Sequence, residues 1–160
     1  MPTFDRILVP VDLSPAPDAA LQMACRIAEE SNGSIQLLHV IRTDRVVGTP
    51  MESTWSGITG AVREEGEAIL DRCLATMSDF AVPVDTEIRE GTPTRNIVSC
   101  ASEANCDLII MATRGRLGME RLILGSVAEQ VVRRSSVPVL TVKSETSPEH
   151  SSSPESLQNA

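Results

Sequence analysis

Five short segments of strand-like composition alternate with segments of helical spacing along this chain, and that alternation decides the class of fold. Most of the strand-like segments are rich in Val, Ile and Leu, as buried strands are. They span residues 4–11, 34–41, 84–89, 108–111 and 137–142. Strands that alternate with helices form a parallel sheet with helices on both faces, joined by right-handed crossovers. We therefore expect an α/β fold, a Rossmann-like open parallel five-stranded sheet in the order 3-2-1-4-5.

The helices between these strands are predicted from residues that typically begin or end a helix. Ser14-Pro15 and Thr92-Pro93 each combine a capping side chain with a proline that suits the first turn of a helix. Asn32-Gly33 is typical of a helix stop. Residues 42–56 show no clear period and predict a long connection, after which one apolar face marks a helix over residues 58–79.

The C-terminal part of the chain predicts an edge strand followed by a tail. Pro138 lies near the start of the last strand, and proline is tolerated mainly at edge positions because it cannot donate a ladder hydrogen bond. Residues 144–160 are rich in Ser and nearly free of apolar side chains. We therefore expect one domain over residues 1–143 and a disordered Ser/Pro-rich tail.

The composition excludes several classes of function. Acidic residues number 22 against 14 basic ones, and a net charge of -8 opposes a phosphate backbone, so we expect no nucleic-acid binding. Lys143 is the only lysine, so the chain lacks the phosphate-binding lysine of a Walker loop. No apolar segment is long enough to span a bilayer, and we expect no membrane insertion.

The four cysteines form no CxxC pair, and no signal peptide precedes the first strand. A reducing, cytoplasmic setting is therefore expected. We interpret the cysteines as small apolar residues buried on helices, and expect no metal site made of protein side chains, because only two histidines accompany them. These cysteines are Cys25, Cys73, Cys100 and Cys106.

The segment that follows the fourth strand combines three features that favour an anion. Glycines at positions 115, 118 and 125 let the backbone approach a ligand closely. Arg114 and Arg116 flank the first of these glycines and supply positive charge. Ser126-x-x-Glu129 has the spacing of a capping box, which would start a helix with its free N–H groups directed into the loop.

Each of these features also has an ordinary explanation: glycines make turns, a capping box starts a helix, and arginines cover solvated helix faces. Their coincidence is informative because ligands of open α/β sheets bind beyond the carboxyl ends of the strands, where the strand order reverses. The first and fourth strands are the natural neighbours of that point. We therefore expect an anion-binding loop from Ala112 to Ser126.

The sequence resembles the universal stress protein family over residues 1–143. The resemblance rests on ILVPVDLS in the first strand, on LLHVI in the second, and on DLIIMATRGR and LILGSVAEQVVRRSSVPVLTVK near the end. The ATP-binding branch of that family has the pattern G-x2-G-x9-G-S/T. Gly115, Gly125 and Ser126 fit its second half, whereas Ala112 stands where the pattern has its first glycine. Arg114 stands where the family often has histidine, and arginine favours an anion.

The resemblance implies that the ligand is ATP, bound together with Mg²⁺. It assigns the nucleoside to residues at the strand ends, namely Pro10, Val11, Asp12, Val40, Met111 and Ala112. It assigns the phosphates to Gly115, Gly125, Ser126 and Val127, and the flanking Arg114 and Arg116 add charge. Asp12 is the one candidate ligand for the cation. Its ordinary alternative role is to cap the end of the first strand. Ser126 cannot use one lone pair for both cap and phosphate, so its two roles compete.

Catalysis is not expected. Glu129 is the expected capping partner, and His39 lies inside the second strand, where a hydrogen-bonded core histidine is the ordinary interpretation, so neither suits a general base. The resemblance implies a nucleotide-liganded stress regulator that forms a homodimer through the last strand, whose apolar edge also favours pairing, and that acts on protein partners. A dimeric scaffold of the same fold without nucleotide stays open. An adenine-nucleotide α-hydrolase is disfavoured, because DLSPAPD after the first strand contains no glycine.

Overall fold

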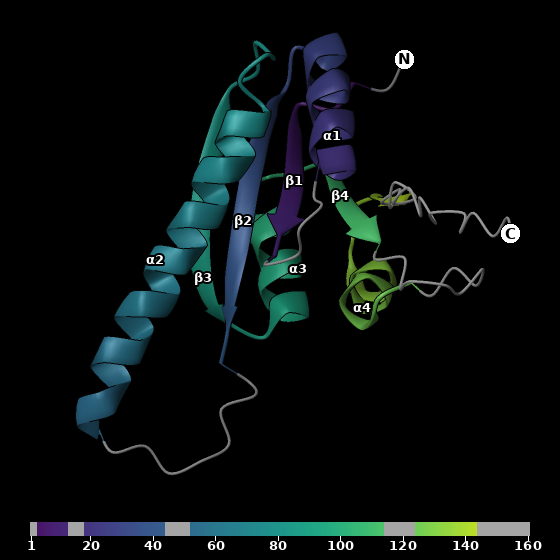
Figure 1. Cartoon of the computed structure of the whole chain (residues 1–160). Coiled ribbons are helices and arrows are strands. Elements are labelled where there is room, and N and C mark those ends of the chain that lie inside the picture. The colour runs from purple at the N-terminus through teal and green to yellow at the C-terminus, as the bar shows by residue number, and fades with distance from the viewer. Residues whose placement is uncertain (1–2, 13–17, 44–51, 114–123, 144–160) are drawn as a thin grey trace, which may run out of the picture.

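The computed structural model describes residues 3–12, 18–43, 52–113 and 124–143. Strands and helices alternate throughout these ranges. In chain order they are β1 (Arg6–Val11), α1 (Asp18–Ser31), β2 (Ser34–Arg42), α2 (Glu52–Thr76), β3 (Val84–Gly91), α3 (Pro93–Glu103), β4 (Leu108–Thr113), α4 (Ser126–Arg134) and β5 (Val139–Lys143). The strands form one parallel sheet in the order β3-β2-β1-β4-β5 (Figure 1), which confirms the expected fold class and strand order.

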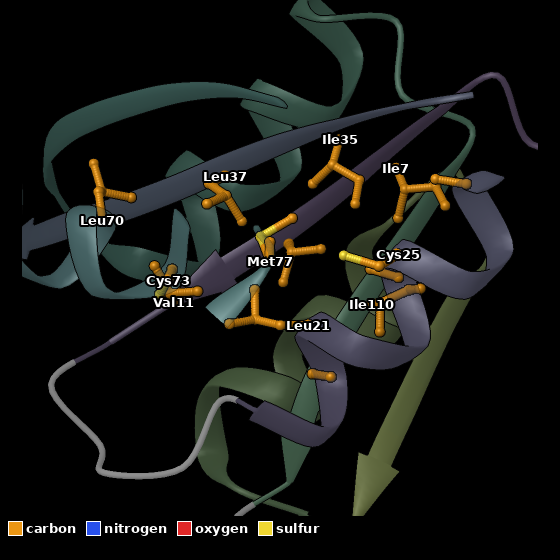
Figure 2. Close-up of a cluster of buried hydrophobic side chains, with 14 of the residues drawn as sticks. Ile7, Val11, Leu21, Cys25, Ile35, Leu37, Leu70, Cys73, Met77 and Ile110 are labelled. Carbon is orange, nitrogen blue, oxygen red and sulfur yellow. The ribbon is translucent and has the colours of Figure 1, made fainter. Parts of the chain in front are cut away.

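Each face of the sheet carries its own hydrophobic core. Alternation along β1 sends Ile7, Val9 and Val11 to the face covered by α1 and α2, and Leu8 to the face covered by α3 and α4. Figure 2 shows the first core, where Leu21 and Cys25 of α1 meet the strands. Because β1 is buried on both faces and paired on both sides, its sequence is apolar from Ile7 to Val11, as predicted.

Most element bounds differ from the sequence prediction by a few residues, and three differences affect its interpretation. α2 begins at Glu52, inside the segment interpreted as a connection. Its first turns extend past the ends of β2 and β3 (Figure 1), and a helical segment with no sheet beneath it needs no apolar stripe. β5 begins at Val139 rather than at residue 137, although it does lie at the sheet edge as Pro138 predicted. Cys106 is buried in the turn before β4, not on a helix.

Asn32 and Gly33, the two residues that follow α1, end the helix in different ways. Asn32 takes the left-handed conformation, with φ 53°, and the N–H of Gly33 donates to the carbonyl of Ala28 at 2.8 Å. Gly33 itself is needed for space, because a Cβ there would lie 2.3 Å from the carbonyl oxygen of Phe4. Asn105, also at φ 53°, ends α3 in the same way.

The end of the sheet at which the strands begin, here called the amino edge, is closed by hydrogen bonds. The Asp107 carboxylate accepts the backbone N–H groups of Asp5, at 2.7 Å, and of Arg6, at 3.3 Å. The Arg6 guanidinium in turn donates to Gln36 and pairs with Asp85. These hydrogen bonds therefore link β4, β1, β2 and β3 near the residues at which the strands begin.

The predicted tail, residues 144–160, and the Ser14-Pro15 helix start lie outside the described residues. Within the described ranges, no helix combines the length and the hydropathy that a bilayer crossing requires.

Candidate functional site

The order of the sheet reverses between β1 and β4. β1 leads into α1, which packs on one face, whereas β4 precedes α4, which packs on the other face. The helices that follow these two neighbouring strands therefore lie on opposite faces of the sheet. This is the location at which the sequence predicted the ligand.

Pairing between β1 and β4 ends before either strand does. The paired residues are Ile7 with Leu108 and Leu8 with Ile109, although the strands continue to Val11 and Thr113. Between β1 and β2, by contrast, pairing continues to the last residue of β1. The tips of β1 and β4 point apart in Figure 1. We call the unpaired ends of these two strands the β1–β4 fork.

His39 ties the end of β1 to β2. Its Nδ1 lies 3.0 Å from the carbonyl oxygen of Val11, so this nitrogen carries a hydrogen and donates it. The residue is 6% exposed, and a Cβ on Gly66 of α2 would lie 2.8 Å from the imidazole Cδ2. The expected core histidine is confirmed. Its contact with the last residue of β1 was not predicted, because nothing in LLHVI shows which strand end the ring reaches.

The residues assigned to the nucleoside fall on two faces of the sheet. Met111 belongs to the core on the α3–α4 face, Val40 packs against that core, and Pro10 shares the face by alternation with Leu8. These three are the ones that can present apolar side chains to a planar base. Val11 and Ala112 belong to the opposite face, so at the fork they can offer only backbone groups.

Two further assigned residues also lie at this end of the sheet. Asp12 is exposed immediately after β1. Val127, in the first turn of α4, packs against the same core as Met111. The structure thus brings a carboxylate, an apolar wall and a helix N-terminus to the same end of the sheet.

The start of α4 corrects the predicted capping box. Gly125 is the N-cap, with φ -56° and ψ 151°, and Ser126 is the first helical residue. The N–H of Glu129 donates to the carbonyl of Gly125 at 2.9 Å, and the Glu129 carboxylate pairs with Arg133 at 3.0 Å. The prediction was wrong by one position because glycine and serine both occur as N-caps, and here Gly125 takes that position.

With Gly125 as the N-cap, Ser126 no longer has two competing roles. The hydroxyl is not needed as a helix cap, and the residue is exposed on the first turn. A Cβ on Gly125 would meet no atom of the described residues within 4 Å. The first turn of α4 therefore offers backbone N–H groups, a hydroxyl and the positive end of the helix dipole. That set of donors suits a phosphate.

The loop assignments to Arg114, Gly115 and Arg116 lie outside the described residues and stay predictions.

The thiols offer no second reactive site. Burial raises the pKa of Cys25 to about 11 and that of Cys100 to about 12, so both thiols are neutral near pH 7. Burial also raises the pKa of Cys73 and Cys106. Across the described ranges, no three His, Cys, Asp or Glu side chains are grouped as a metal site would require.

Known proteins resemble this chain along almost its whole length. The model of the universal stress protein family matches residues 3–143. Universal stress protein MJ0531 of Methanocaldococcus jannaschii is 36% identical over 140 residues, which is 88% of this chain and 82% of that protein. The solved structure of protein MJ0577, from the same organism, has a TM-score of 0.78 and 28% identity, and the match covers 91% of this chain and 99% of that one.

A further solved structure shows the same fold with a ligand. It is the universal stress protein from Archaeoglobus fulgidus in complex with dAMP, which has a TM-score of 0.65 and 20% identity. The match covers 86% of this chain and 96% of that chain. At this identity the likeness shows the fold alone.

Proposed function

Because this chain belongs to the universal stress protein family, we propose that it binds an adenine nucleotide at the β1–β4 fork and acts as a cytoplasmic stress-response regulator. The observation that carries the proposal is the fork itself. Two central strands of one sheet stop pairing after only two residue pairs, at the point where the strand order reverses. The backbone N–H and C=O groups that continued pairing of β1 with β4 would use are therefore available to a ligand.

The surroundings of the fork match the parts of a nucleotide. The apolar side chains of Pro10, Val40 and Met111 share one face of the sheet, and planar bases bind against such surfaces. The first turn of α4, beginning at Ser126, starts on that same side and suits the phosphates. The dAMP complex of a protein with the same fold agrees with an adenine nucleotide as the ligand class.

The nucleotide we propose is ATP with Mg²⁺. Gly125 fits a phosphate because its missing side chain leaves the N-terminus of α4 accessible and is required by no contact among the described residues. Ser126 would donate its hydroxyl to the same phosphates. Asp12, exposed at the end of β1, would accept ribose hydroxyls or hold the cation through water. When bound, Mg²⁺ would neutralise part of the phosphate charge.

We propose binding without rapid hydrolysis. A hydrolase needs a group that orients or deprotonates the attacking water. The His39 imidazole is buried and donates to Val11, and the Glu129 carboxylate pairs with Arg133 along the solvent side of α4. Neither side chain is placed to act on a γ-phosphate. ATP would therefore act as a ligand that changes the protein's choice of partner.

We propose further that the chain forms a homodimer through β5. This edge strand is short and carries Val139, Leu140 and Val142, and Leu140 is 37% exposed. Leu140→Lys is expected to convert a dimer into a monomer in sedimentation velocity, with ATP binding retained. A wild-type monomer at all concentrations would contradict the dimer without affecting the nucleotide site.

The nucleotide proposal is tested by titration calorimetry of ATP with Mg²⁺, together with mass spectrometry of small molecules released from the purified protein by heat. Gly125→Val is expected to weaken binding by tenfold or more, because its side chain blocks the N-terminus of α4 (about 1.4 kcal/mol or more). Gly60→Val is the matched control, since a Cβ there also meets no described atom within 4 Å but lies on α2. No binding by the wild type, or equal binding by both variants, contradicts the proposal.

A further inference from the structure

Pro10 occupies a position where proline is rare. It lies inside β1, which pairs with β2 on one side and with β4 on the other. Within sheets, proline is found mainly on edge strands, at first residues and at bulges, because it has no N–H to donate. A proline in a central strand therefore needs an explanation.

The hydrogen bonds at the start of β1 show which neighbour each residue faces. The carbonyl of Asp5 accepts the N–H of Ser34, at the start of β2, and the carbonyl of Arg6 accepts the N–H of Asp107, at the start of β4. In a strand, the N–H and C=O of one residue point to the same side and alternate from residue to residue. Leu8 and Pro10 therefore face β4, as Arg6 does.

The same alternation identifies the partner that Pro10 would have on β4. The N–H of Ile109 donates to the carbonyl of Pro138, next to β5, so the backbone groups of Ile110 and Ala112 face β1. The register pairs Leu8 with Ile109, and continuing it sets the nitrogen of Pro10 against the carbonyl of Ile110. That nitrogen has no hydrogen, and pairing ends at this step.

We infer that Pro10 opens the β1–β4 fork by withholding this hydrogen bond, and that it thereby positions the strand ends for the nucleotide. This inference rests on the proposed function. The missing bond leaves the carbonyl of Pro10 and the N–H of Ala112 facing the fork, where the polar edge of a ligand can pair with them. The bond from His39 to Val11 holds the end of β1 on the β2 side. Pro10 is therefore a positioning residue through its backbone, in addition to any contact its ring makes.

Two substitutions separate the backbone role from the ring contact. Pro10→Ala supplies an N–H and removes the apolar ring, whereas Pro10→Val supplies an N–H and keeps an apolar side chain of similar size in a residue that favours strands. If the ring contact alone matters, Pro10→Val should bind nearly as the wild type does. If the open fork is required for binding, both variants should bind ATP weakly.

The closure of the fork is measured directly by NMR on the labelled, ligand-free full chain. In both variants the new N–H of residue 10 is expected to be protected from hydrogen exchange and to show a scalar coupling through the hydrogen bond to the carbonyl carbon of Ile110. Titration with ATP and Mg²⁺ is expected to show affinity at least tenfold below wild type for both variants (about 1.4 kcal/mol per tenfold). Pro138→Ala, the control beside β5, is expected to retain wild-type affinity.

Each outcome decides one part of the inference. A rapidly exchanging N–H at residue 10, or the absence of coupling to Ile110, overturns the role of Pro10 in opening the fork. A protected N–H with unchanged ATP affinity in Pro10→Val overturns its role in binding. If the wild type binds no ATP, the proposed function fails, and the exchange measurement still decides whether Pro10 opens the fork.

Discussion

Among the described residues, hydrogen bonds join the strands at the amino edge of the sheet, whereas at the carboxyl edge β1 and β4 stop pairing before either strand ends. Asp107 accepts two N–H groups at the first edge, and Gly33 is present because the carbonyl of Phe4 leaves no room for a Cβ. At the second edge β1 and β4 stop pairing, and Gly125 faces space that no described residue fills. A glycine required by the fold and a glycine that the fold does not require thus lie at opposite ends of one sheet. This difference is the reason that we propose the carboxyl edge as the ligand site.

The two glycines give the largest expected contrast. Gly33→Ala is expected to lower the free energy of unfolding by about 3 kcal/mol, because its Cβ would overlap a backbone carbonyl that cannot move without β1. Gly125→Ala is expected to change it by only about 0.5 kcal/mol, since alanine is a poorer N-cap and its Cβ would meet no described atom within 4 Å. Urea unfolding measures both, and equal losses would contradict the contrast.

The Asp107 carboxylate supplies the second contrast. Asp107→Ala leaves the N–H groups of Asp5 and Arg6 without their acceptor and is expected to cost about 2 kcal/mol of unfolding free energy. Because both groups lie at the amino edge, the affinity of the folded variant for ATP is expected to equal that of wild type. A variant of normal stability, or one that is folded but fails to bind, would show that the two edges are not independent.

His39 is the one residue at the carboxyl edge where stability and binding should change together. His39→Leu removes the donor to Val11 and is expected to cost about 1 kcal/mol of stability and to weaken ATP binding about fivefold. His39→Asn can place an N–H near the Nδ1 position and is expected to recover most of both. If Asn is no better than Leu in calorimetry, the hydrogen bond to Val11 does not position the site.

Ser126→Ala is the smallest expected change. Since Ser126 is not the N-cap of α4, the unfolding free energy is expected to stay within about 0.5 kcal/mol of wild type. ATP affinity is expected to fall about fivefold, through loss of one hydroxyl donor to phosphate. A stability loss near 1 kcal/mol with unchanged affinity would restore the capping role that the sequence predicted.

The fold was predictable because its signals are local and repeated. β1 and β4 are apolar because they are buried on both faces, and Pro138 marks β5 as an edge. The cap of α4 was mispredicted because Gly125 and Ser126 both satisfy the local rule, and only the three-dimensional backbone selects between them. The link from His39 to Val11 and the effect of Pro10 on β4 depend on which backbone groups face each other across strands. That register is not visible in one segment of sequence.

The central claim, that an adenine nucleotide binds at the carboxyl edge, is tested most directly by titrating labelled protein with ATP and Mg²⁺ and following every backbone amide. The account predicts saturable shifts at Asp12, Ala112 and the first turn of α4 from Ser126. It predicts unchanged signals at Gly33 and Asp107. Shifts confined to the amino edge, or no saturable shift at millimolar ATP, would contradict it.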